Sequence, residues 1–257
     1  MRNNRKQSFM QGIITLMFSQ VLIKVLGLAY KLYLTNKEGY GDAGNAISSS
    51  GFHIYALLLT ISSVGVPNAV SKLISERLSI GDERGANKIF KVAFAFFSII
   101  GFASSAFLFF NAHYLANYVL AIPEAELTLM CLAPSIFFVS LISVYRGYFN
   151  GYQNMRPMAA SQTVEQLSKM SLSILLVEVI CYIFGTAKDK TAIMAAASNL
   201  ATTIATFISF IYLTSLYIKE GKYNNYNKRR IRGMTNRQIL KNIIIIAMPM
   251  TISAVLG

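Results

Sequence analysis

The sequence has little charge, and this excludes most classes of soluble protein. Only 14% of its 257 residues are Asp, Glu, Lys or Arg, against roughly 25% in an ordinary soluble domain. Apolar residues make up 54% of the chain, and its mean hydropathy is +0.48. This composition is typical of a protein embedded in a lipid bilayer and leaves no room for a large soluble domain.

Cysteine and histidine are equally scarce, with two of each in the chain. Cys131 and Cys181 both fall inside long apolar stretches. Neither a disulfide framework nor a Cys/His metal cluster can be assembled from so few residues. We therefore expect no metal and no cofactor.

Long apolar runs are what the chain does contain. A helix needs about 20 mostly apolar residues to cross a bilayer. Six runs reach membrane length, over 9–34, 46–70, 89–110, 126–146, 159–183 and 192–217. The sequence thus predicts an all-α, polytopic membrane helical bundle.

The last part of the chain predicts a boundary after the sixth run. Residues 218–240 form the longest and most basic hydrophilic segment, and a seventh apolar run begins near 241 and stops at Gly257. Seventeen residues are too few to cross the hydrocarbon as a helix. We expect a six-helix unit over 1–217, a basic loop over 218–240, and the start of a truncated seventh helix over 241–257.

The net charge of +13 raises the question of nucleic-acid binding, which the placement of the charges answers. If each run is a crossing, 18 of the 24 Lys and Arg residues fall on one side of the membrane and three on the other. The positive-inside rule then predicts a cytoplasmic N-terminus and a cytoplasmic 218–240 loop in a multi-pass protein of the cell membrane. We expect membrane lipids, and not nucleic acid, as partners of these charges.

Polar residues lie on one face of the first run. Gln20, Lys24, Gly27 and Lys31 are spaced by four, three and four residues, which places them on the same side of a helix. A lysine near the bilayer centre costs roughly 2.5 to 3.5 kcal/mol, so Lys24 needs a water-filled cavity, an acidic partner or an anionic ligand. Lys31 lies nearer the outer end, where an interfacial anchor and a ligand-binding role are both open.

The fifth run repeats this pattern with Gln162, Glu165 and Lys169. Glu165 and Lys169 are four residues apart with the glutamate first, the favourable order for an ion pair within one helix. The pair either allows the helix to insert or belongs to a functional site. We expect Lys24 and Lys169 to line one water-accessible cavity, with Glu165 within ion-pair reach of Lys169.

The loop and helix start around residue 150 carry a resemblance to a known family. Residues 146–166 read RGYFNGYQNMRPMAASQTVEQ. This segment resembles the RGYFxGxQNMxPxAxSQxxEQ motif of the stage V sporulation protein B group, within the polysaccharide exporter and lipid II flippase family of the MATE-like superfamily. KVLG at 24–27, GVPNAVSK at 65–72 and MPMTI at 248–252 extend the resemblance.

The resemblance implies a V-shaped transporter of two six-helix lobes. Such a protein moves an undecaprenyl-pyrophosphate-linked sugar, a lipid II or polysaccharide precursor, to the outer leaflet by alternating access, without covalent chemistry. Family members are about twice as long, which implies that activity needs a missing C-terminal lobe or a second chain. The resemblance assigns Lys24 to a cationic cavity. The position of a second cation in the family's first helix is occupied here by Tyr30, with Lys31 one residue later. The resemblance also puts Arg146 at the cytoplasmic mouth, where it meets a headgroup or holds the following loop.

Three alternative functions are weighed against the flippase. A MATE-type exporter of cationic drugs needs uncompensated acids in its cavity, whereas the polar faces here are net basic. A multipass glycosyltransferase or polymerase usually needs clustered acids or a metal at the membrane face, but Asp42, Asp82 and Asp189 fall in separate loops. A six-helix scaffold without transport is the third alternative.

Overall fold

The computed structural model describes residues 2–63, 65–184, 189–223 and 234–256, and each regular element there is a helix. This confirms the predicted fold class. The long helices are α1 (Arg2–Thr35), α2 (Gly41–Ser63), α3 (Val66–Ser79), α4 (Glu83–Phe110), α6 (Glu126–Gly151), α7 (Arg156–Ile183), α8 (Lys190–Tyr223) and α9 (Asn236–Leu256). Three short turns of helix, α5 (Ala112–Tyr114), η1 (Leu115–Val119) and η2 (Pro123–Ala125), connect α4 to α6.

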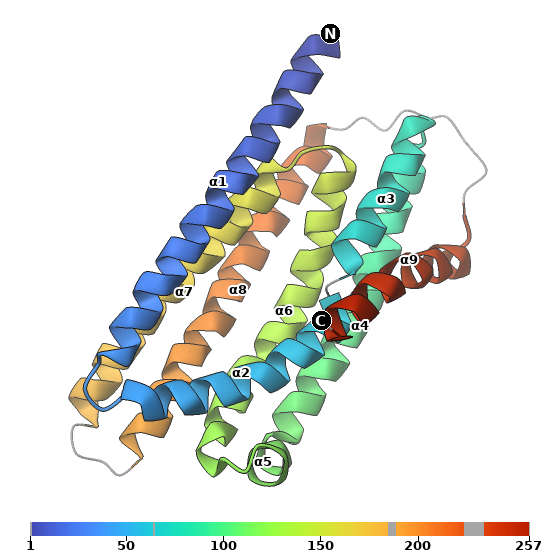
Figure 1. Ribbon diagram of the computed structural model, residues 1–257. Helices are drawn as coiled ribbons and strands as arrows, with labels where there is room; N and C mark the ends of the chain where they lie inside the picture. Colours follow the sequence, from blue (N-terminus) through green and yellow to red (C-terminus); the bar gives the residue numbers. More distant parts are fainter. Residues whose placement is uncertain (1, 64, 185–188, 224–233, 257) are drawn as a thin grey trace.

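The helices are arranged around α6, which is the most buried of the long apolar helices and packs against α2, α3, α4 and α8 (Figure 1). α7 packs between α8 and α1, so α1 lies at the edge of the bundle and is mostly exposed. Large apolar side chains such as Phe18, Val25 and Leu28 are exposed on α1. Extended apolar surface of this kind marks contact with lipid or with another protein.

The described residues contain five helices that are long and apolar enough to cross a membrane: α1 from Met17 onward, α4, the stretch from Pro123 to Gly151, α7, and α8 as far as Lys219. The prediction of a single span over 46–70 is wrong, because two helices cover this range: α2 ends at Ser63 and α3 begins at Val66. Pro67 lies in the first turn of α3. A proline has no N–H, and its ring clashes with the carbonyl four residues earlier, here that of Ser63, where α2 ends.

α3 is amphipathic and packs closely on α6. Its buried residues recur every three or four positions, the spacing of one helix face: Val66, Ala69, Val70, Leu73 and Ile74. Two glycines of α6, Gly147 and Gly151, allow the close approach. A Cβ added at Gly147 would lie 2.8 Å from the Val70 Cβ and 2.9 Å from the Pro67 carbonyl oxygen.

We expect Gly147→Ala to destabilise the protein by about 1 to 3 kcal/mol, because an added methyl group must push α3 away from α6. The measurement is thermal unfolding in detergent, followed by far-UV circular dichroism. Gly27→Ala on α1 is the matched control, since the nearest atom to an added Cβ there is the Gln166 Nε2 at 3.7 Å, an ordinary contact. Equal midpoints for the two variants would contradict the packing argument.

The ends of the helices agree with the predicted crossings. The N-terminus, the α3–α4 connection, the α6–α7 turn and the last turn of α8 lie at one end of the bundle (Figure 1). These are the segments where the basic residues gather. α2 and α3 together carry the chain from one end to the other, so the broken second span leaves the order of the loops unchanged.

The seventh helix begins earlier than predicted, at Asn236 rather than near 241. Ile239 and Ile243 are fully buried in a core formed with α3, α4, α6 and α8, so α9 packs directly on the preceding helices. Most of the basic loop, residues 224–233, lies outside the described residues. The division of the chain into 1–217, 218–240 and 241–257 stays a prediction.

Candidate functional site

The polar faces predicted separately on the first and fifth runs contact each other. α1 and α7 run in the same direction side by side (Figure 1). Gln20 Nε2 donates to Gln162 Oε1 at 2.6 Å, and the Tyr30 and Ser173 hydroxyls lie 2.7 Å apart. Because polar side chains of each helix bond to the other helix, their hydrogen-bonding groups find partners within the protein at these positions.

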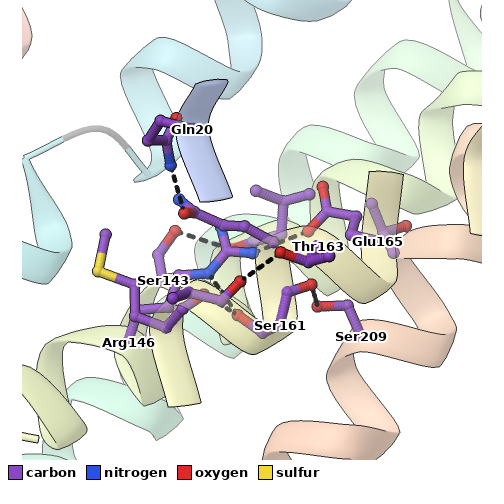
Figure 2. A network of polar contacts seen from close by, with 12 residues as sticks. Gln20, Ser143, Arg146, Ser161, Thr163, Glu165 and Ser209 are labelled. Atoms are coloured by element: carbon purple, nitrogen blue, oxygen red, sulfur yellow. Dashed lines mark hydrogen bonds and ion pairs between the residues drawn. The ribbon is translucent and has the colours of Figure 1, made fainter. Parts of the chain in front are cut away.

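Arg146 joins the helices on either side of the α6–α7 turn (Figure 2). Its Nη2 lies 2.8 Å from Glu165 Oε2, and its Nε donates to Ser161 Oγ at 3.2 Å. Ser209 on α8 donates to the Ser161 carbonyl at 3.2 Å. The arginine therefore links α6 to α7, on a framework to which α8 also contributes, and its two expected roles stay predictions.

The ion pair of Glu165 corrects one prediction. We expected Glu165 to pair with Lys169 in the same helix, but among the described residues its ion pair is with Arg146. Arg146 comes from a neighbouring helix, so spacing along one helix does not reveal it.

Lys169 points to α2 instead. Its ammonium nitrogen lies 5.3 Å from the centroid of the Phe52 ring, within the range of a cation–π contact. The lysine is half-buried, and no carboxylate of the described chain lies within ion-pair distance of it. It is therefore a cation inside an apolar helix that no carboxylate of the described chain contacts directly.

Lys24 lies on α1 between Gln20 and Gly27, the two positions that face Gln162 and Gln166 of α7. Its side chain is exposed and has no ion pair among the described residues. No contact joins it to Lys169 there, so the shared cavity stays a prediction. Lys31 is also exposed, and both of its expected roles remain open.

We call the following group the polar strip, because its members are the polar and charged residues on one face of α1 and one face of α7, together with Arg146 of α6, which pairs with Glu165. It consists of Gln20, Lys24, Arg146, Gln162, Glu165, Gln166 and Lys169. The strip carries three cations and one carboxylate, and this excess of positive charge lies within helices that are apolar enough to span a membrane.

A second charged group at the other end of α1 and α7 was missed from the sequence. Lys37 Nζ lies 2.6 Å from both carboxylate oxygens of Glu178, and the Tyr33 hydroxyl donates to the same carboxylate. The hydrogen bond to Glu178 raises the pKa of Lys37. The sequence does place Lys37 and Glu178, which have opposite charges, at the same end of two predicted crossings. An ion pair between them can be inferred only when the two helices are known to be neighbours.

The sequence matches one family along almost its whole length. A family model described as "Polysaccharide biosynthesis protein" matches residues 9–257. The chain is 24% identical over 254 residues to stage V sporulation protein B of Bacillus subtilis, covering 98% of this chain and 47% of that protein. It is 27% identical over 229 residues to the lipid II flippase MurJ of the same organism, covering 86% and 40% respectively. The chain thus spans less than half the length of these curated relatives.

Solved structures show the same fold. A MOP superfamily transporter from Pyrococcus furiosus aligns with a TM-score of 0.69 at 19% identity, covering 97% of this chain and 52% of that one. An outward-facing multidrug resistance MATE family transporter aligns with a TM-score of 0.72 at 18% identity, covering 97% and 53%. The helices of this chain thus follow the arrangement of about half of each of these transporters. Together with the five apolar helices and the curated relatives, this fold indicates a multi-pass membrane protein.

Proposed function

Because this chain belongs to the polysaccharide biosynthesis protein family, we propose that it forms one lobe of a flippase and is not an enzyme. Its cargo is an undecaprenyl-pyrophosphate-linked sugar, a lipid II or polysaccharide precursor, which moves to the outer leaflet by alternating access. Relatives in Bacillus subtilis include a protein named as a lipid II flippase. The N-terminus and the basic loop are cytoplasmic in this proposal, which the charge distribution supports.

The observation that carries the proposal is the positive charge of the polar strip. Lys24 and Lys169 have no carboxylate within ion-pair distance among the described residues. A charge inside a membrane protein needs water, a partner or a ligand of opposite sign. A pyrophosphate group supplies several negative oxygens at once, so it neutralises the excess positive charge of the strip as a whole.

The residues of the proposed cargo path are those that the sequence first indicated. Positive charge comes from Lys24, Arg146 and Lys169. Hydrogen bonds come from Gln20 and Gln162. Glu165 neutralises Arg146 in the empty site. Lys31 is either an interfacial anchor beside this path or part of it.

A drug exporter that takes cations is less well supported by the same geometry. Such a cavity needs carboxylates free to attract the drug. Glu165 is the carboxylate of the polar strip, and Arg146 already neutralises it at 2.8 Å. The strip therefore repels a cationic cargo.

The second half of the transporter is part of the proposal. Alternating access requires two units that rock about a site between them, and the chain spans 47% of stage V sporulation protein B. We propose that a C-terminal lobe or a second chain completes the site and is needed for activity.

Native mass spectrometry of the purified protein tests the cargo. We expect undecaprenyl pyrophosphate carrying a sugar to remain bound, because its headgroup matches the strip and its long chain matches the apolar surface of α1. Phosphatidylglycerol, with a single phosphate, serves as the competing lipid. Retention of phosphatidylglycerol alone, or of a cationic drug such as ethidium in preference to the lipid pyrophosphate, would contradict the proposal.

A further inference from the structure

The ion pair between Arg146 and Glu165 uses little of what either side chain offers. One nitrogen, Nη2, meets one oxygen, Oε2, at 2.8 Å. The Arg146 Nε has its own partner in Ser161, so the guanidinium stays in place whether or not Glu165 is bound. The Arg146 and Glu165 side chains are 13% and 28% exposed, so the pair is partly accessible, chiefly at Glu165.

The guanidinium has spare capacity for an anion. Arginine carries five N–H donors, and Arg146 directs two of its nitrogens, Nε and Nη2, at partners among the described residues. Its Nη1 donates to no residue of the described chain. A phosphate group binds two parallel donors of a guanidinium at once, so it competes well with a carboxylate held by a single contact.

A displaced Glu165 carboxylate has a second cation one helical turn away. Lys169 lies four residues further along α7, the spacing at which side chains of a helix meet. Its ammonium has the Phe52 ring as its contact, at 5.3 Å. If Glu165 changes its partner from Arg146 to Lys169, its carboxylate stays neutralised. Arg146 is then free to hold the incoming anion.

We propose that Glu165 is an internal counter-anion, which a phosphate group of the cargo displaces from Arg146 and which Lys169 then receives. This inference rests on the proposed function, because it takes the cargo to be a pyrophosphate. When the cargo leaves, the carboxylate returns to Arg146. Glu165 thereby lowers the affinity of the empty site and helps to expel the cargo after transport. Phe52 links the exchange to α2, since Lys169 leaves the ring when it binds Glu165.

Binding to the purified chain in nanodiscs of neutral phosphatidylcholine tests the exchange. The probes are undecaprenyl pyrophosphate and inorganic pyrophosphate. We expect Glu165→Gln to bind both about tenfold more tightly than the unmodified chain, because the amide competes poorly for the guanidinium. Glu165→Asp keeps the charge on a shorter side chain, so its affinity for both probes should lie between those of the unmodified chain and Glu165→Gln. This variant keeps the exchange testable if Glu165→Gln does not fold. Glu38→Gln, an exposed acid between α1 and α2, is the control and should leave both affinities unchanged.

Two double variants separate the parts of the exchange. In Arg146→Gln/Glu165→Gln the gain in affinity should disappear, since the anion has lost its acceptor. Lys169→Met should weaken binding more in the unmodified chain than in Glu165→Gln, because only the former has a carboxylate to rehouse. Equal weakening in both backgrounds would overturn the role of Lys169 as the receiver of Glu165.

The outcomes distinguish this inference from the proposed function. If the unmodified chain binds undecaprenyl pyrophosphate but Glu165→Gln binds it no more tightly, the counter-anion is overturned and the cargo stands. If neither protein binds either probe, the cargo itself is overturned. The same comparison in nanodiscs that contain phosphatidylglycerol identifies the other source of phosphate. If Glu165→Gln binds phosphatidylglycerol more tightly than the unmodified chain does, and neither protein binds a pyrophosphate probe, the site belongs to a bulk lipid headgroup and both proposals are overturned.

Discussion

Replacing Lys24 by glutamine should lower the affinity of the protein for undecaprenyl pyrophosphate by a factor of about ten to one hundred. Glutamine keeps a similar length but removes the charge, so an ionic contact with phosphate is lost. A hydrogen bond to a charged group contributes about 1.5 to 3 kcal/mol, and about 1.4 kcal/mol corresponds to a factor of ten. The measurement is a binding titration of the purified protein in neutral nanodiscs.

The matched control for this substitution is Lys91→Gln. Lys91 is also an exposed lysine on an apolar helix, but it lies on α4, outside the polar strip. Folding and membrane insertion should be preserved in both variants, which circular dichroism and membrane fractionation check. Equal affinity of Lys24→Gln and the unmodified protein would show that Lys24 is structural and would remove it from the cargo path.

Reconstituted alone in liposomes, the chain should not move a fluorescent lipid-linked oligosaccharide between the leaflets. The polar strip provides one wall of a site, and a single wall cannot be closed on one side of the membrane while it opens on the other. An unpaired strip also leaves Lys24 against lipid, which is unfavourable for a charge. We therefore expect the isolated chain to be inactive, and either to associate with itself through the polar strip or to require a second chain.

The assay compares three preparations at equal protein density. Protein-free liposomes give the background, the Bacillus subtilis lipid II flippase MurJ gives the positive signal, and the purified chain should match the former. Crosslinking establishes whether the chain is a monomer under these conditions. Flipping by a demonstrated monomer, at a rate near that of the positive control, would show that one lobe is sufficient and that the alternating-access proposal is wrong.

The fold class was predictable because membrane helices are specified locally. Each crossing must satisfy its backbone hydrogen bonds internally and needs about 20 mostly apolar residues to span the hydrocarbon, so length and hydropathy reveal it without knowledge of its neighbours. The second run was the exception. Its apolar length predicts one helix, but the effect of Pro67 on the carbonyl of Ser63 divides it into α2 and α3.

The polar faces were predictable in the same way, but their partners were not. Helical spacing placed Gln20 and Lys24 on one face of α1, and Gln162, Glu165 and Lys169 on one face of α7. The contact of Gln20 with Gln162 depends on which helices are neighbours. Tyr30 lies three residues after Gly27 on the same face, so its contact with Ser173 had a signal in the spacing.

By itself, the sequence determined that this protein is a helical membrane bundle, which segments are basic, and which residues bring charge into its apolar helices. These properties depend on composition and on the 3.6-residue period of a single helix. Only the tertiary structure decided that Glu165 pairs with Arg146 of α6 and that Lys169 lies over Phe52 of α2. Ion pairs form between whichever opposite charges the packing brings within a few ångströms, and the packing of α6 against α7 and α2 is a property of the whole bundle.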